Sequence, residues 1–190
     1  GATGKTGLRL VEQLKAKGHA PIALVRESSD TGSLPDGVTQ RQGDLTDLQS
    51  GVCRDCDAVI FAAGSGGSTG PDMTDKVDRD GAKRLIDLAA EADVSRFVML
   101  SSAGADDPDP ESELGHYLQA KHEADEHLKA SGLSYAIIRP VSLTDDDGTR
   151  DMRFGDVVDP SGKAARGDVA AVLADAVDDD RWVGKALLMQ

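Results

Sequence analysis

A tyrosine and a lysine four residues apart, Tyr117 and Lys121, are the side chains of this sequence best suited to acid–base chemistry. On a helix this spacing places both on one face, together with Leu114, Ala124 and Leu128. A phenol, whose pKa is about 10, needs a neighbouring cation to exchange protons near neutral pH. An ammonium group on an otherwise apolar face either extends to solvent or has a function in the interior. The pair is therefore a candidate catalytic centre, and the alternative is that Tyr117 only packs in the core.

The first seven residues form a second candidate site, a G-x-x-G-x-x-G run that leads straight into a predicted amphipathic helix. Backbone N–H groups at the start of a helix attract anions. The glycines permit a tight turn, let the backbone approach a pyrophosphate and allow the helix to pack closely on a sheet. The run therefore predicts a dinucleotide-binding turn. Its expected cofactor contacts are Gly1, Thr3, Gly4, Lys5, Thr6 and Gly7.

Short β-rich segments alternate with longer helical patterns along the whole chain, as they do in βαβ units. Strands are predicted at residues 21–26, 38–41, 58–63, 96–101, 135–139 and 185–189. Helices are predicted at residues 6–17, 75–92, 116–130 and 168–177, with a short helical turn near 47–52. The fold class that follows is α/β, a doubly wound and mostly parallel Rossmann-type sheet with helices on both faces.

Signals at the ends of these elements agree with that arrangement. Gly18 and Gly132 are positioned to end helices, and Asp168 is positioned to cap the start of one. The longest segment without a regular pattern, residues 144–167, is either a loop that covers a substrate or a merely solvated loop. A dinucleotide fold also needs a strand just before its first glycine. We therefore expect an apolar strand to precede Gly1 and to fill the centre of the sheet.

Composition and charge limit the class of protein. A chain of 190 residues with 39% hydrophobic residues can bury one core, so residues 1–190 are expected to form a single domain. No run approaches the ~20 apolar residues of a membrane helix. The net charge of −13 argues against nucleic acid or an anionic membrane as a partner, because both attract basic surfaces. We expect a cytoplasmic protein that acts on a small molecule, with its oligomeric state left open.

The acidic residues are spread along the chain, with aspartate runs at 145–147 and 178–180. Strong net charge keeps a protein soluble when salt screens its self-repulsion. We interpret the pattern as adaptation to a high-salt cytoplasm, and the alternative is an ordinary acidic protein.

No metal site is expected. Cys53 and Cys56 form a lone C-x-x-C that precedes an apolar run instead of opening a helix, so a structural role is favoured over a zinc or redox role. The histidines, at positions 19, 116, 122 and 127, show no metal-ligand spacing.

Seven short motifs, taken in order, resemble the short-chain dehydrogenase/reductase superfamily, in particular its atypical, single-domain NAD(P)-binding branch with NmrA-like and flavin-reductase-like members. The motifs are the glycine run of residues 1–7, Leu24-Val25-Arg26, Gly43-Asp44-Leu45, Ala62-Ala63-Gly64, Leu100-Ser101-Ser102, Tyr117 with Lys121, and Ile138-Arg139-Pro140. The resemblance covers nearly the whole chain.

The resemblance implies an NADP(H) site. It places Arg26 on the adenosine 2′-phosphate, where a guanidinium suits the ligand and an NAD-preferring site would have an acidic residue. The alternative is that Arg26 is a solvated arginine at the end of a strand. The other implied contacts are Asp44 and Leu45 at the adenine, Ala62, Ala63 and Gly64 along the middle of the cofactor, and Pro140, Val141 and Leu143 at the nicotinamide.

The resemblance also implies the chemistry. Tyr117 would protonate a carbonyl oxygen as hydride leaves the nicotinamide, and Lys121 would bind the nicotinamide ribose and lower the pKa of the phenol. Ser101 or Ser102 would donate a hydrogen bond to the developing oxyanion. Lys121 as a ribose ligand alone, beside a packing tyrosine, is the alternative.

Three functions are compatible with these residues. The first is an NADPH-dependent reductase of a small carbonyl, quinone or flavin, and the second is a non-catalytic protein that binds NADP(H) and responds to it. The third is an epimerase or dehydratase of nucleotide sugars, which would normally need a larger substrate domain than the residues after Pro140 can build.

Overall fold

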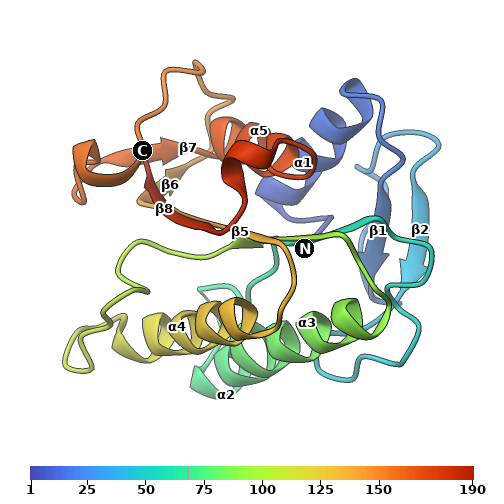
Figure 1. Ribbon diagram of the computed structural model, residues 1–190, viewed down its shortest axis with the longest axis horizontal. Helices are drawn as coiled ribbons and strands as arrows, with labels where there is room; N and C mark the ends of the chain where they lie inside the picture. Colours follow the sequence, from blue (N-terminus) through green and yellow to red (C-terminus); the bar gives the residue numbers. More distant parts are fainter. Residues whose placement is uncertain (68) are drawn as a thin grey trace.

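The structure is a computed structural model that describes residues 1–67 and 69–190. Figure 1 shows a sheet between two layers of helices. One face is covered by α1 (Lys5–Ala16) and α5 (Arg166–Asp175). The other face is covered by α4 (Gly115–Ala130) and by a helical stretch made of α2 (Pro71–Thr74), the π-helix η1 (Asp75–Gly81) and α3 (Ala82–Glu91). The doubly wound arrangement expected from the sequence is confirmed.

The strands pair in parallel throughout. Four of them lie in the order β3-β4-β5-β8, and these are β3 (Ala58–Phe61), β4 (Arg96–Leu100), β5 (Tyr135–Pro140) and β8 (Lys185–Met189). A separate pair consists of β1 (Ile22–Val25) and β2 (Thr39–Gln42). All six were predicted, five of them because they are short apolar runs between turn residues, whereas β2 is mostly polar and lies between the turns that flank it.

A gap interrupts the sheet between β1 and β3. A cavity of about 470 Å³ lies there, lined by residues 22–24 of β1, by residues 58–63 and by the side chains of α1 that face the sheet. Central strands of a parallel sheet are covered on both faces and carry apolar side chains toward both. The cavity thus lies where a further strand is expected from the sequence, and that strand itself stays a prediction.

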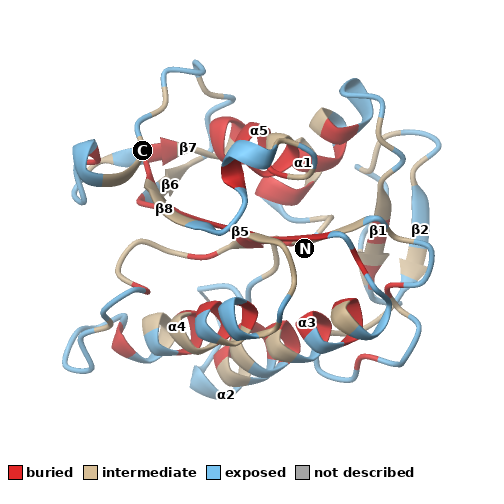
Figure 2. Cartoon of the chain, in the orientation of Figure 1, coloured by how far each residue is buried: buried red, intermediate tan, exposed pale blue. Residues whose placement is uncertain are grey.

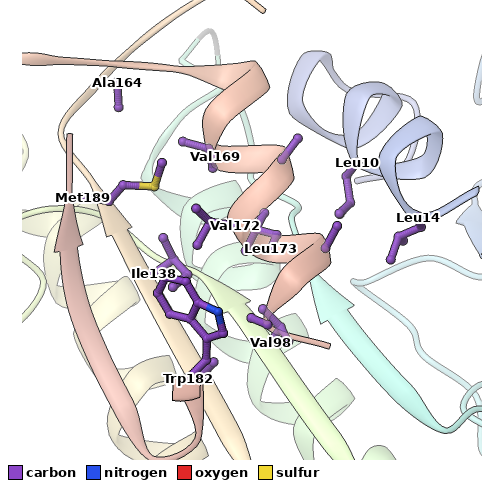
Figure 3. Packing of buried hydrophobic residues seen from close by; sticks show 14 of the residues in the cluster. Leu10, Leu14, Val98, Ile138, Ala164, Val169, Val172, Leu173, Trp182 and Met189 are labelled. Carbon is purple, nitrogen blue, oxygen red and sulfur yellow. The ribbon is translucent and has the colours of Figure 1, made fainter. Parts of the chain in front are cut away.

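Two apolar clusters fill the space on either side of the sheet (Figure 2). Successive side chains of a strand point to opposite faces. Val98 and Ile138 therefore pack with α1 and α5, where Figure 3 shows them near Leu173 and Trp182. Phe97, by contrast, packs with α3 and α4 on the other face. These clusters fix the positions of the helices, and therefore also the positions of the polar side chains that the helices carry. Within the described residues, no helix is both long and apolar enough to cross a bilayer.

Four expectations about elements were wrong in detail. Residues 47–52 form turns and not a helix. The helix predicted at 75–92 begins earlier, at Pro71, and contains a π-helical turn. Helix α5 begins at Arg166, so Asp168 lies inside it and does not cap it. The segment 144–167 contains a 3₁₀ turn, η2 (Gly155–Val157), and takes part in a parallel pair, β6 (Ser142–Thr144) with β7 (Lys163–Ala165). Such three-residue strands are too short for a periodic pattern to predict.

Candidate functional site

The glycine run forms a tight turn against the end of β3. The N–H of Gly4 donates to the carbonyl of Gly1 at 3.0 Å, and the first bond within the helix runs from Leu8 N to Gly4 O at 2.9 Å. A Cβ at Gly1 would overlap the carbonyl oxygen of Ala62, and a Cβ at Gly7 would overlap that of Gly1. Both positions therefore require glycine, because backbone atoms already fill the space that a side chain would take.

This turn fits a pyrophosphate. The N–H groups of Lys5, Thr6 and Gly7 precede the first intrahelical hydrogen bond, so they lack helical partners. In this described part of the chain no side chain caps α1 and its first turn holds no acidic residue. An anion placed at this helix start would be stabilised by the unpaired N–H groups and by the helix dipole.

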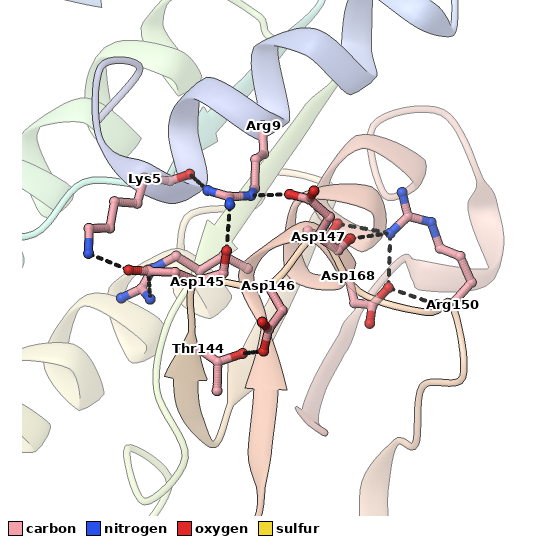
Figure 4. Close-up of polar contacts among 10 residues, drawn as sticks. Lys5, Arg9, Thr144, Asp145, Asp146, Asp147, Arg150 and Asp168 are labelled. Carbon is pink, nitrogen blue, oxygen red and sulfur yellow. Dashed lines mark hydrogen bonds and ion pairs between the residues drawn. The ribbon is translucent and has the colours of Figure 1, made fainter.

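The segment after β6 is tied to the same helix start (Figure 4). Asp145 accepts from the ammonium of Lys5 at 2.5 Å and from Arg166 of α5 at 2.6 Å. Arg9, one turn into α1, reaches Asp147 at 3.2 Å. The segment 144–167, expected to be either a substrate-covering or a solvated loop, thus begins beside the glycine turn. The side chain of Lys5 is directed to a carboxylate, and its contact with a cofactor stays a prediction.

Asp168, on α5, fixes the next part of this loop. Its carboxylate accepts from the backbone N–H groups of Thr149 and Arg150 at 3.1 and 2.9 Å, and also from the Arg150 side chain at 2.9 Å. Burial raises the pKa of Asp168, but these hydrogen bonds outweigh burial and hold that pKa below its usual value. The residue expected to cap a helix therefore organises a loop.

The adenosine end of the proposed cofactor site lies where β1 and β2 end. Arg26 directly follows β1 and is exposed, and Asp44 follows β2. Hydrogen bonds from the backbone and hydroxyl of Thr46 lower the pKa of Asp44, and the charge of Arg26 lowers it further. The structure thus brings Arg26 and Asp44 within electrostatic reach of each other, while their contacts with a cofactor stay predictions. Leu45 is approached closely by the π-helix, because a Cβ on Gly81 would lie 2.7 Å from its carbonyl oxygen.

The remaining predicted cofactor residues follow strand ends at the same edge of the sheet. Ala62, Ala63 and Gly64 come after β3, while Pro140 ends β5 and Val141 and Leu143 come next. In an open parallel sheet the crevice beyond the carboxyl ends of the strands is the usual ligand site. The parallel fold therefore places these residues at the edge of the sheet where such a crevice is expected, and their contact with a cofactor stays a prediction.

Lys121 is buried and paired with a carboxylate. Of the two possibilities that the sequence left open, its ammonium therefore lies in the interior and does not extend to solvent. Its side chain is 3% exposed, and its nitrogen lies 3.0 Å from a carboxylate oxygen of the fully buried Asp78. The same nitrogen lies 5.7 Å from the centre of the Tyr117 ring and 5.5 Å from that of Phe61. Burial lowers the pKa of Lys121, but the charges of Tyr117 and Asp78 more than offset this and raise it above the usual value for a lysine.

The face shared by Tyr117 and Lys121 is less apolar than expected. Tyr117 is half-buried, and Ala124 and Leu128 are buried as predicted. Leu114, however, is 60% exposed. It lies just outside the helix, because α4 begins at Gly115, so helical periodicity does not extend to it.

The two candidate serines have different surroundings. Ser101 is buried, and its hydroxyl donates to Asp125 at 2.8 Å. Asp125 also accepts from Arg139 at 3.0 Å. Burial raises the pKa of Asp125, although Arg139 and Ser101 oppose this change. Ser102 is half-buried, and among the described residues its hydroxyl donates one long bond, 3.3 Å, to the carbonyl of Ala103. The hydroxyl of Ser102 is therefore the freer of the two to meet a ligand.

The two buried carboxylates that act on Lys121, Asp78 and Asp125, were not foreseen from the sequence. Asp125 could have been found, because it stands four residues after Lys121 on the same helix face. Asp78 carries no such local signal, since its partner lies on a different helix. Arg139 was noted as part of a motif, but its pairing with Asp125 was not foreseen.

The cysteines and histidines have ordinary surroundings. Cys53 and Cys56 are free thiols, and burial together with the neighbouring Cys56 raises the pKa of Cys53 to about 11, which disfavours the reactive thiolate. His116 and His127 pair with single aspartates at 2.9 and 2.6 Å. His122 meets the carbonyl of a loop residue at 2.8 Å.

Comparisons with known proteins agree with the geometry. The model of a family described as NAD(P)H-binding matches residues 1–180. A Bacillus subtilis (strain 168) protein described as "Uncharacterized sugar epimerase YhfK" is 37% identical over 193 residues, which cover 98% of this chain and 89% of that protein.

Two solved structures are also similar to this chain over its full length. A putative NAD-dependent epimerase/dehydratase from Bacillus halodurans has a TM-score of 0.91 and 36% identity, covering 100% of this chain and 90% of that one. ChuY, an anaerobillin reductase from Escherichia coli O157:H7, has a TM-score of 0.80 and 25% identity, covering 100% and 93%.

Proposed function

The chain belongs to the NAD(P)H-binding family, as an atypical member of the short-chain dehydrogenase/reductase superfamily, and from this premise we propose that it is an NADPH-dependent reductase of a small carbonyl, quinone or flavin. One observation carries the proposal. Lys121 is held buried and charged 5.7 Å from the ring of Tyr117, on a helix beside the crevice. A fold that bound the cofactor without turnover would not need to bury a charge beside a phenol.

Several residues would hold the cofactor. The N–H groups of the glycine turn would bind the pyrophosphate, and Arg26 would pair with the 2′-phosphate that distinguishes NADPH from NADH. The exposed position of Arg26 at the end of β1 supports this role, and the neighbouring carboxylate of Asp44 is already engaged by Thr46. Lys121 would contact the nicotinamide ribose. When bound, the nicotinamide supplies a hydride to the substrate.

The protein's own contribution is proton transfer and positioning. The hydroxyl of Tyr117 would donate its proton to the carbonyl oxygen of the substrate, and the adjacent ammonium of Lys121 would stabilise the resulting phenolate. Ser102, and not Ser101, would donate a hydrogen bond to the same oxygen, because the hydroxyl of Ser101 is engaged by Asp125. Pro140 and the buried Val141 would form an apolar wall that limits water near the reacting atoms.

A second function, epimerisation of a sugar, is favoured by the descriptions of the B. subtilis and B. halodurans relatives. The structure of residues 141–190 argues against the epimerase. Among these residues β8 extends the central sheet and α5 covers it, while β6 and β7 form a small parallel pair, so residues 141–190 do not make a separate substrate domain.

The deciding experiment is a screen of NADPH oxidation with aldehydes, quinones and flavins in molar KCl, beside a direct titration of NADPH binding. Turnover with one of these classes supports the reductase. Binding without turnover supports the non-catalytic NADP(H)-binding protein. Conversion of a nucleotide sugar without net oxidation of added cofactor supports the epimerase and contradicts our proposal.

A further inference from the structure

Asp78 and Lys121 form an ion pair that is closed off from solvent. Their side chains are 0% and 3% exposed, and 3.0 Å separates the carboxylate oxygen from the ammonium nitrogen. A buried ammonium without a counter-charge tends to lose its proton, and a buried carboxylate needs hydrogen bonds besides its partner. Asp78 has such a bond, because its second oxygen accepts from the backbone N–H of Ser65 at 2.9 Å.

The π-helix η1, which carries Asp78, packs against the segment that follows β3. Asp78 lies in the π-helix η1, and wide turns of this kind are rare and often found at functional sites. A Cβ on Gly64 would lie 3.2 Å from Asp78, so glycine there leaves room for the carboxylate. The π-helix thus joins the wall after β3, where the cofactor is expected, to the helix that carries Tyr117.

We propose that Asp78 is a positioning residue for the reaction, which holds the ammonium of Lys121 in place and in its charged form beside Tyr117. The other ionisable groups that face Lys121 are Tyr117 and Asp125, both on α4. Asp125 is already engaged by Arg139 and Ser101. Among the described residues, Asp78 is the carboxylate within ion-pair distance of Lys121. The statement about Tyr117 rests on the proposed function, whereas the control of the charge on Lys121 does not.

The charge on Lys121 can be measured without cofactor or substrate. In protein with isotope-labelled lysine side chains, the Lys121 resonance, assigned by its loss in Lys121→Arg, is followed against pH by NMR. In Asp78→Asn we expect Lys121 to titrate at least about two pH units lower than in the unmodified protein. The matched control is Asp75→Asn, which removes a carboxylate of the same π-helix that pairs with His116 and Arg79. It should leave Lys121 unchanged. An unchanged titration in Asp78→Asn would overturn the inference.

If Asp78→Asn does not fold, the double variant Asp78→Asn with Lys121→Met decides the same question. Removing one partner leaves an uncompensated buried group, whereas removing both leaves none. We therefore expect the double variant to melt at a higher temperature than either single variant. A double variant that fails to fold just as Asp78→Asn does, so that Lys121→Met restores nothing, would contradict the coupling of the two charges.

The pH dependence of turnover tests the link to Tyr117. Turnover that needs the Lys121 ammonium is lost at the pH where Lys121 deprotonates. The alkaline limb of kcat should therefore move to lower pH in Asp78→Asn and stay in place in Asp75→Asn. A uniform loss of kcat at every pH would show a merely structural role for Asp78. Absence of turnover in the unmodified protein would contradict the proposed reductase alone, and the Lys121 titration would still decide the inference.

Discussion

Tyr117 is half-buried on α4, while Lys121, one turn further along, is buried and paired with a carboxylate from another helix. An ammonium held in this way stabilises a phenolate nearby, because little water is present to screen the charge. The two neighbouring serines also differ in their partners. The hydroxyl of Ser101 is bonded to the buried Asp125, whereas that of Ser102 is the freer one to bind a ligand. At this scale, function depends on which partners a side chain already has.

The first prediction concerns the hydroxyl of Tyr117. Tyr117→Phe keeps the ring and removes the proton donor, so carbonyl reduction should fall by at least about 10²-fold while NADPH affinity stays nearly unchanged. Reduction of a flavin needs no protein acid and should persist. The matched control is Tyr135→Phe, which alters the other tyrosine, at the start of β5. Steady-state rates with both substrate types give the answer, and full activity of Tyr117→Phe on both would make Tyr117 a packing residue.

The second prediction concerns the choice of cofactor. NADPH should bind more tightly than NADH, and Arg26→Ala should remove about 1.5–3 kcal/mol of NADPH binding, because it deletes a charge-assisted contact. That loss corresponds to a roughly 10- to 150-fold weaker Kd. Binding titrations with both cofactors measure it, with the exposed Arg84→Ala on α3 as the control. Equal affinity of the unmodified protein for the two cofactors would contradict the role of Arg26.

At the scale of elements, the segment after β6 is held by charged groups at the starts of α1 and α5. The pairs of Lys5 and Arg9 are exposed, so each contributes little, in the range of about 0–1 kcal/mol. Asp168 differs, because its side chain is only 10% exposed and it accepts two backbone hydrogen bonds. Asp168 is therefore the main anchor of the loop beside the phosphate turn.

The third prediction follows from the lowered pKa of Asp168. A carboxyl group whose pKa is lower in the folded than in the unfolded state stabilises the fold above its unfolded pKa, about 3.9, and loses that effect as pH falls through the folded pKa. Asp168→Asn should therefore lower the free energy of unfolding by about 1.5–3 kcal/mol near neutral pH. The difference should shrink in strong acid. Melting temperatures of the unmodified protein and the variant, measured near neutral pH and in strong acid, test this, and the exposed Asp151→Asn is the control. A difference that does not change with pH would contradict it.

At the scale of the whole molecule, the surface carries far more negative than positive charge. The chain has 34 acidic and 21 basic residues, so its net charge is −13. Added salt screens the repulsion among the excess carboxylates, but it also weakens the exposed ion pairs. Because such pairs contribute little and the repulsion acts across the whole surface, we expect screening of the repulsion to dominate.

The fourth prediction is that the melting temperature rises from dilute buffer to molar KCl. Calorimetry or circular dichroism at increasing KCl measures it, and sucrose at matched osmolality is the control for effects other than charge screening. A melting temperature that is flat or falls with KCl would contradict adaptation to high salt.

The fifth prediction concerns the gap between β1 and β3. An apolar segment of five residues fused directly before Gly1 can extend into the cavity of about 470 Å³ and pair with both strands. Burial of apolar side chains gives about 1.5–3 kcal/mol each, so even a net gain of about 3 kcal/mol would raise Tm by roughly 6–12 °C. A segment of the same length with alternating aspartates is the control. Equal melting temperatures for the two fusions would show that the gap does not accept a strand.

The sequence by itself was enough for the order of the six longer strands and the main helices, the tight glycine turn before α1 and the shared helix of Tyr117 and Lys121. These features depend on periodicity and turn residues within short windows, where neighbours in sequence are also neighbours in space. Only the tertiary structure decided that Asp78 is the partner of Lys121 and that Ser101 faces Asp125. It also placed the loop after β6 against α1. Those contacts join segments far apart in the chain, and packing of the sheet against its helices, not local propensity, brings them together.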